Sequence, residues 1–316
     1  MKVLRKVILS LLGLALLADI GISFYMDRVA LYNAPRCVDR RSVVQSLSQR
    51  GAFLTHWLDS IDNDTILRDT FVTTPDGRRL HAWYLRAPSP TPRTALLIHG
   101  YRNQGLDMLP IGYLYHRQLG FNVLLPDLQA HGQSDGQYIQ MGWKDRLDAL
   151  RWTEVAQTLF GNDISMVVHG ISMGAATTMM LSGEETPPFV KVFVEDCGYT
   201  SVWDEFRNEL HNAYKQPPFP LLYSCSALCK IRHGWSYGQA SALKQVGRCT
   251  KPMLFIHGDA DTYVPTWMVH PLYEAHKGKK ALWLSPGVAH ADSFWTYPEE
   301  YTQRVASFLE ECGFMR

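Results

Sequence analysis

Gly170, Ser172 and Gly174 form a Gly-x-Ser-x-Gly motif directly after the apolar run of residues 164–168. Small residues follow the motif, as expected for a helix that packs closely on its neighbours. In this context a serine can act as a nucleophile, because the tight turn holds its hydroxyl clear of the backbone near a helix N-terminus. The motif alone is a weak signal, since glycine and serine are common residues. It predicts acyl transfer when a base, an acid and oxyanion donors accompany it.

A histidine and two aspartates occupy the places that a general base and its orienting acid require. His290 follows the last predicted strand, and Asp259 and Asp261 follow the strand before it. We expect Asp261 to orient His290, because it lies further along the loop and has better reach. Asp259 is the reserve, and Asp196, after the strand at 189–194, is a second reserve.

Two backbone N–H groups are expected to bind the oxyanion. The first belongs to Met173, the residue after the nucleophile, and the second to Tyr101, in the loop after the apolar run of residues 95–98. We expect His99 to shape this loop rather than to react. Asp127 and the polar residues that follow it are expected to hold loops beside the site.

Short apolar runs separated by helical patterns provide the scaffold for these residues. Runs of this kind predict strands that are buried on both faces of a mostly parallel sheet, which makes the fold class α/β. The expected strands are residues 95–98, 121–125, 164–168, 189–194, 253–256 and 281–284, with a hairpin over 71–85. The expected helices are residues 109–119, 143–160 and 295–309.

Residues 199–248 interrupt this alternation with an aromatic-rich, helical stretch, which we interpret as a cap inserted above the sheet edge. The alternative is a plain surface excursion. No acidic pair suited to binding a peptide N-terminus is identified in this cap. The predicted organisation is a terminal apolar segment at 1–26, a helical lead-in at 27–69 and a catalytic domain at 70–316.

The N-terminal segment is basic and then apolar. Lys2, Arg5 and Lys6 precede residues 7–26, which are apolar apart from Asp19 and long enough to span a bilayer. We expect a membrane anchor with a cytoplasmic basic end and an extracytoplasmic catalytic domain. The alternatives are a cleaved signal peptide, which would give a secreted or periplasmic protein, and a buried helix.

The overall composition excludes several classes of function. The chain has 316 residues, is 46% hydrophobic and 19% charged, and carries a formal net charge of +1. This is a globular composition without a field that would attract nucleic acid. Zinc-ligand spacing and a phosphate-binding glycine loop are absent from the sequence, so we expect neither a metal nor an organic cofactor.

Four of the six cysteines fall between residues 197 and 249. In an exported domain a disulfide between Cys225 and either Cys229 or Cys249 is chemically allowed, and we treat it as a hypothesis. The alternative is a set of buried, unpaired thiols.

Together these motifs resemble the α/β-hydrolase superfamily. The resemblance extends from about Phe71 to the C-terminus and is carried by His99-Gly100, Asp127 with His131-Gly132-Gln133-Ser134, Gly170-Ile171-Ser172-Met173-Gly174, His257-Gly258-x-x-Asp261-x-x-Val264-Pro265 and His290. More narrowly, the chain resembles bacterial, membrane-anchored hydrolases of the serine aminopeptidase and acyl-esterase group. The resemblance implies an α/β-hydrolase fold with a helical cap. A His-Gly-Gly-Gly motif is absent, so the chain does not resemble the hormone-sensitive-lipase type.

These observations predict a serine hydrolase that cleaves a carboxylic ester, with an apolar acyl or aryl group suggested by the aromatic cap. Ser172 would attack, His290 would accept its proton, and Asp261 would orient the imidazole. A peptidase or amidase of the serine aminopeptidase type and an acyltransferase are the alternatives. A non-enzymatic binding protein on the same fold is the least favoured.

Overall fold

The computed structural model describes residues 1–34, 39–62 and 65–314. Its strands are β1 (Arg68–Thr73), β2 (Arg79–Leu85), β3 (Arg93–Ile98), β4 (Asn122–Pro126), β5 (Ser165–Ile171), β6 (Val190–Asp196), β7 (Met253–Gly258) and β8 (Lys280–Ser285). Its α-helices are α1 (Lys2–Leu31), α2 (Arg40–Arg50), α3 (Thr55–Ile61), α4 (Leu109–Gly112), α5 (Asp145–Phe160), α6 (Met173–Ser182), α7 (Val202–Tyr214), α8 (Leu221–His233), α9 (Ala242–Val246), α10 (Val269–Ala275), α11 (Ser293–Thr296) and α12 (Pro298–Glu311). Short turns of other helix types are η1 (Ala52–Leu54), η2 (Gly105–Met108), η3 (Tyr113–Gln118) and η4 (Thr266–Met268).

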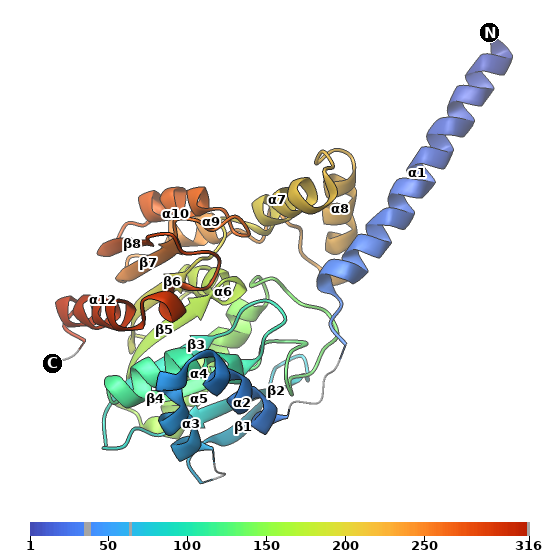
Figure 1. Ribbon diagram of the computed structural model, residues 1–316. Helices are drawn as coiled ribbons and strands as arrows, with labels where there is room; N and C mark the ends of the chain where they lie inside the picture. The colour runs from blue at the N-terminus through green and yellow to red at the C-terminus, as the bar shows by residue number, and fades with distance from the viewer. Residues whose placement is uncertain (35–38, 63–64, 315–316) are drawn as a thin grey trace.

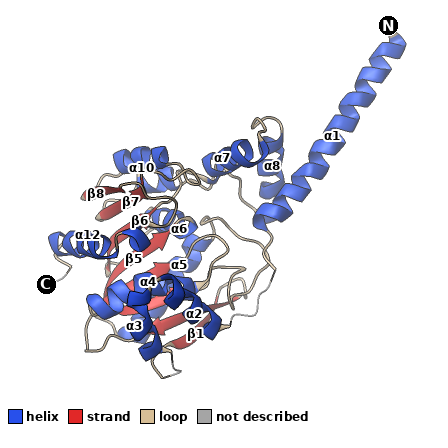
Figure 2. Cartoon of the chain, in the orientation of Figure 1, coloured by secondary structure: helices blue, strands red, loops and turns tan. Residues whose placement is uncertain are grey.

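The strands, drawn in red in Figure 2, form one sheet in the order β1-β2-β4-β3-β5-β6-β7-β8. β1 pairs with β2, and β2 with β4, in antiparallel fashion, whereas the pairs from β4 to β8 are parallel. The predicted hairpin and mostly parallel sheet are therefore confirmed. The parallel arrangement brings the loops after β3, β5, β6, β7 and β8 to the same edge of the sheet.

Both faces of the central part of the sheet are buried, because successive side chains of its strands enter different cores. On β3, Ala95 and Leu97 face one core, and Leu96 and Ile98 face the other. Helices α5, α6 and α10 contribute to the core that contains Leu96, and α2, α3 and α12 contribute to the core that contains Ala95. This explains why the strands are continuously apolar in the sequence.

Two predicted helices are interrupted in the structure. The expected helix at 109–119 is a short α4 followed by a π-helical segment, η3. The expected helix at 295–309 is divided into α11 and α12 by Tyr297, which has non-helical backbone angles and precedes Pro298. A residue before proline is sterically disfavoured in the helical region, so the break has a local cause.

Helix α1 leaves the body of the molecule and ends, at its N-terminus, far from the sheet (Figure 1). It is long and apolar enough to cross a membrane, and 6% of its most apolar 18-residue window is buried. The buried-helix interpretation of this segment is therefore wrong. Its C-terminal part is different: Ser23, Asp27 and Leu31 are buried, and the helix packs there against α8.

Helices α7 and α8 lie together at the end of the molecule from which α1 emerges (Figure 1). Helix α9, which also falls within residues 199–248, packs against α6 and α10. Cys225, Cys229 and Cys249 are free, buried thiols, so the alternative of unpaired thiols is confirmed and the hypothetical disulfide is absent among the described cysteines.

Candidate active site

The turn between β5 and α6 places Ser172 in a strained conformation, with φ 58° and ψ −120°. A non-glycine residue with positive φ is costly and persists where its surroundings fix it. The flanking glycines have a steric cause. A Cβ at Gly170 would lie 2.0 Å from the carbonyl oxygen of Gly174, and a Cβ at Gly174 would lie 2.0 Å from that of Ile98. The motif is thus required by the close approach of α6 to β3 and β5.

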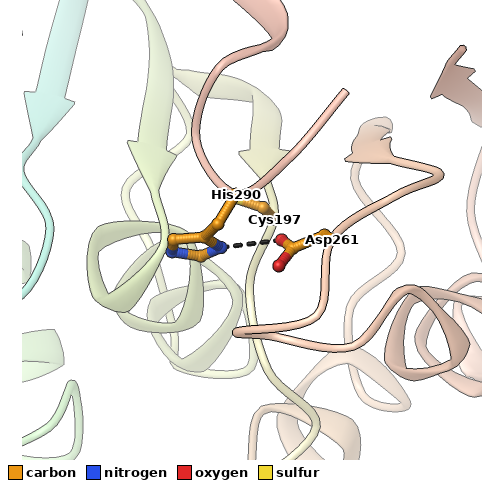
Figure 3. Close-up of side chains that lie close together, drawn as sticks. All are labelled: Cys197, Asp261 and His290. Atoms are coloured by element: carbon orange, nitrogen blue, oxygen red, sulfur yellow. Dashed lines mark hydrogen bonds and ion pairs between the residues drawn. The ribbon is translucent and has the colours of Figure 1, made fainter. Parts of the chain in front are cut away.

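Ser172, His290 and Asp261 lie in one chain of hydrogen bonds. Ser172 Oγ is 2.8 Å from His290 Nε2, and His290 Nδ1 is 2.7 Å from Asp261 Oδ2. Figure 3 shows the carboxylate facing the edge of the imidazole ring. The geometry suits an Nδ1–H donated to Asp261, which leaves Nε2 free to accept the serine proton. Folding therefore brings together three side chains from three separate loops.

Asp261 is held on both of its carboxylate oxygens. Its Oδ1 accepts hydrogen bonds from the backbone N–H groups of Tyr263 and Val264, at 2.9 and 3.0 Å. Burial alone would raise the pKa of Asp261, but contacts with His257 and His290 bring that pKa below its ordinary value. An ionised Asp261 can accept the hydrogen bond from the Nδ1–H of His290.

The two reserve aspartates have other partners. Asp259 Oδ1 accepts a hydrogen bond from Gly287 N at 2.6 Å, which fastens the loop after β7 to the loop after β8. Asp196 Oδ2 accepts one from the Tyr301 hydroxyl at 2.9 Å, and burial raises the pKa of Asp196 to about 6. Neither is hydrogen-bonded to His290 in the described part of the chain.

Tyr101 and Met173 line the same cavity as Ser172. Met173 opens α6, and the first N–H groups of a helix have no partner within the helix. Tyr101 lies in the loop after β3. His99 accepts a hydrogen bond from Leu128 N on Nε2 and faces the Gly100 carbonyl oxygen with Nδ1, at 3.0 and 2.7 Å. Burial lowers the pKa of His99, and a neutral ring fits both contacts.

Asp127 holds the neighbouring loops together. It accepts hydrogen bonds from Gly105 N on Oδ1 and from Gln133 N on Oδ2, at 2.7 and 2.9 Å, and its Oδ2 lies 2.7 Å from His81 Nδ1. A Cβ at Gly132 would lie 2.0 Å from Asp127 Oδ2, so glycine is required at this position as well.

Cys197 lies beside Asp261 and His290, and the three side chains offer ligand atoms within 4.8 Å of one another (Figure 3). This set does not suit a metal ion. Burial and nearby carboxylates raise the pKa of Cys197 well above its ordinary value, whereas a thiolate is the form that ligates metals. Both imidazole nitrogens of His290 are already engaged.

The cavity beside Ser172 has a volume of about 230 Å³. Most of its wall is apolar or aromatic and comes from α7, α8 and the C-terminal end of α1. The lining includes Met26, Val29 and Ala30 from α1, Leu221, Leu222 and Cys225 from α8, and Glu205 and Glu209 from α7.

Two glutamates of α7 line the cavity, in the stretch where the sequence alone identifies no acidic pair suited to binding a peptide N-terminus. Glu205 is buried, its Oε2 has no hydrogen-bond partner among the described residues, and burial raises its pKa well above the ordinary value. Glu209 is half-buried one helical turn later. Spacing of four residues on a helix would have indicated that both face the same side. No pattern in the sequence predicted that residues of α1 would line the cavity.

Sequence comparison identifies relatives over most of the chain. A sequence profile of the prolyl oligopeptidase family matches residues 118–313. The Bacillus subtilis protein YqkD is 30% identical over 73% of this chain and 75% of its own length. The Saccharomyces cerevisiae membrane protein YNL320W is 25% identical over 77% of this chain and 79% of its own length.

Solved structures share the fold. The Pyrococcus furiosus esterase Pf2001 superposes with a TM-score of 0.63 and 26% sequence identity, covering 78% of this chain and 92% of that one. The strand order and the position of the Gly-x-Ser-x-Gly turn support the same fold as these similarities do. The chain belongs to the prolyl oligopeptidase family of hydrolases and has the α/β-hydrolase fold.

Proposed function

We propose that the protein is a serine hydrolase that cleaves a carboxylic ester through an acyl-enzyme intermediate. The observation that carries this proposal is the hydrogen-bond chain from Asp261 through His290 to Ser172. The oxyanion donors are the backbone N–H groups of Tyr101 and Met173. The reaction requires neither a metal nor an organic cofactor.

The reaction has two halves. Ser172 Oγ attacks the ester carbonyl while its proton moves to His290 Nε2, and Asp261 stabilises the resulting imidazolium. The tetrahedral intermediate collapses, the alkoxide leaves with the proton from His290, and an acyl-serine remains. Water then attacks the acyl-serine with His290 as base, which releases the acid and restores the hydroxyl.

Ester hydrolysis is supported by the lining of the cavity and by one neighbour. The wall near Ser172 is formed largely by apolar and aromatic side chains, which favour an apolar acyl or aryl group. The Pyrococcus furiosus protein with a similar structure is an esterase.

The test is the turnover of p-nitrophenyl butyrate by the detergent-solubilised full chain. Ser172→Ala should lower kcat by about 10⁴-fold or more. Ser165→Ala, on the strand that leads to the same turn, is the matched control and should keep full activity. A fluorophosphonate should add its mass to wild-type protein and leave Ser172→Ala unlabelled. Near-wild-type turnover or labelling by Ser172→Ala would refute the proposal.

A peptidase or amidase is the second candidate, favoured by Glu205. A buried carboxyl oxygen without a partner is costly, and the ammonium of an aminoacyl substrate would satisfy it. Aminoacyl arylamides and acyl esters with the same leaving group distinguish the two activities. For the peptidase, Glu205→Gln should lower kcat/KM for the arylamide selectively.

We also propose that α1 anchors the protein in a membrane, with the catalytic domain outside the cytoplasm and a cap formed within residues 199–248. Many apolar side chains of α1 are exposed, including Leu11, Leu14 and Leu17, and one relative carries the name of a membrane protein. The full chain should stay in the membrane fraction after an alkaline wash. Protease added to intact cells should digest the catalytic domain and spare the basic N-terminus.

A further inference from the structure

The last two turns of α1 form one wall of the cavity that holds Ser172. Met26, Val29 and Ala30 line it from α1, opposite residues of the cap. Leu222 and Cys225 of α8 line the same cavity and belong to the same apolar core as Leu31. The N-terminal helix is therefore part of the substrate site as well as a candidate anchor.

Polar contacts fix this wall in place. Asp27 is fully buried and lies 2.7 Å from Arg232 Nη1 and 2.9 Å from His233 Nε2, both on α8. The carbonyl oxygens of Val29 and Ala30 accept hydrogen bonds from the side chains of Arg102 and Tyr101, each at 2.7 Å. The end of α1 is thus bonded both to the cap and to the loop that carries a candidate oxyanion donor.

The same helix is exposed and apolar immediately before this wall. Ile22, Phe24 and Tyr25 are exposed large side chains, and the exposed apolar residues continue toward the N-terminus. Val29 lies seven positions after Ile22, which corresponds to a rise of about 10 Å along a helix. The cavity therefore lies about two helical turns from a segment that we assign to the bilayer.

The cap also carries exposed apolar side chains on α8 and in the connection that precedes it. Phe219, in the connection between α7 and α8, is 71% exposed, and Ile231 on α8 is 82% exposed. Tyr223, one turn into α8, is also exposed and packs edge-on against Phe219. Figure 1 places this connection on the side from which α1 projects. Exposed apolar surface of this kind marks contact with a membrane or a partner, and continuity with α1 selects the membrane.

From this arrangement we infer that the substrate is a membrane-resident ester of a long acyl chain, which reaches the cavity from the bilayer along α1. The carbonyl end of the chain reaches Ser172, and the remainder lies along α1. The inference rests on the proposed function and adds no reactant: the acyl group passes to Ser172 and then to water, and the alcohol leaves with the proton from His290.

The test uses the full chain in phosphatidylcholine vesicles and compares p-nitrophenyl palmitate in the vesicles with p-nitrophenyl acetate in solution. Val29→Trp places a bulky side chain in the wall and should lower the palmitate-to-acetate ratio of kcat/KM by about tenfold or more. Ile22→Trp is the matched control, on the same helix face two turns earlier and outside the cavity, and should keep the wild-type ratio.

Three results would contradict the inference. An unchanged ratio in Val29→Trp would show that the chain does not lie along α1. Equal turnover of palmitate delivered by a cyclodextrin without vesicles would assign the substrate to the aqueous phase. Failure to hydrolyse any ester, acetate included, together with no fluorophosphonate label on Ser172, would overturn the proposed function itself.

Discussion

Asp27 and Arg232 form an ion pair that joins the N-terminal helix α1 to α8, with 2.7 Å between Oδ2 and Nη1. The carboxylate of Asp27 is completely buried, whereas the guanidinium of Arg232 remains partly exposed and also contacts the Tyr138 hydroxyl. His233 approaches the other carboxylate oxygen. A buried carboxylate needs such partners, so this pair determines where the end of α1 lies.

Asp27→Ala should release the end of α1 from α8. The change leaves Arg232 and His233 without their partner, and we expect a loss of about 2 kcal/mol in the local stability of this contact. Hydrogen exchange of the amides of residues 26–31 measures that loss. Asp59→Ala, at an exposed position on α3, should leave these amides unaffected. Equal protection in Asp27→Ala and wild type would mean that apolar packing alone holds α1.

Asp261→Asn should lower kcat by about 10⁴-fold, because an amide stabilises the wrong imidazole tautomer and does not stabilise an imidazolium at His290. Asp259→Asn is the matched control: its amide oxygen can still accept the hydrogen bond from Gly287 N. Steady-state hydrolysis of p-nitrophenyl butyrate by both variants separates the roles. A larger loss in Asp259→Asn would assign the orienting role to Asp259.

Gly174→Ala should destabilise the fold by about 3 kcal/mol or more, since the added Cβ would overlap the carbonyl oxygen of Ile98 and neither backbone can move freely. Gly238→Ala is the control, because a Cβ there meets no atom within 4 Å. Thermal unfolding followed by circular dichroism compares the two variants. A melting temperature of Gly174→Ala equal to that of Gly238→Ala would show that α6 can shift away from β3.

The free energy of unfolding should fall as pH rises, because the buried carboxyl group of Glu195 resists ionisation. Burial raises the pKa of Glu195 from 4.5 to about 8, and its Oε1 has no partner in the described part of the chain. Between these values the folded protein binds a proton that the unfolded chain has lost, so the free energy of unfolding falls with pH across this window.

Glu195→Gln removes that titration and keeps an acceptor for Gly198 N. We expect the variant to gain stability relative to wild type at pH 8 and to differ little at pH 5. Glu185→Gln, at an exposed position, should follow the wild-type profile. Melting temperatures measured across this range test the sign, and a variant with the wild-type slope would contradict it.

The parallel part of the sheet was predictable because most positions of its strands are buried on both faces and are apolar. The residues that the structure brings to Ser172 were predictable for a related reason: in a parallel sheet, loops after neighbouring strands meet at one edge, so His290 and Asp261 could be placed from strand order alone. The choice of Asp261 over Asp259 needed only the length of the loop.

The remaining features depend on packing between segments that are distant in sequence. In the sequence, Asp27 marks the polar end of an apolar span, and only its contact with Arg232 shows that it fixes the end of α1 against α8. Cys225, Cys229 and Cys249 are unbonded, and the sequence could not decide between the hypothetical disulfide and buried thiols, because pairing depends on the fold. Glu205 and Glu209 resemble an ordinary solvated helix face until the cavity is located beneath them.

The placement of Met26, Val29 and Ala30 has a practical consequence for preparing the enzyme. A truncated, water-soluble fragment that starts after Leu31 would lack one side of its binding pocket and two hydrogen-bond acceptors for the loop of Tyr101 and Arg102. Substrate screens on such a fragment would report the selectivity of an opened site. A fragment that begins at Ser23 lacks most of the exposed apolar part of α1 and retains Met26, Val29 and Ala30, which complete the pocket.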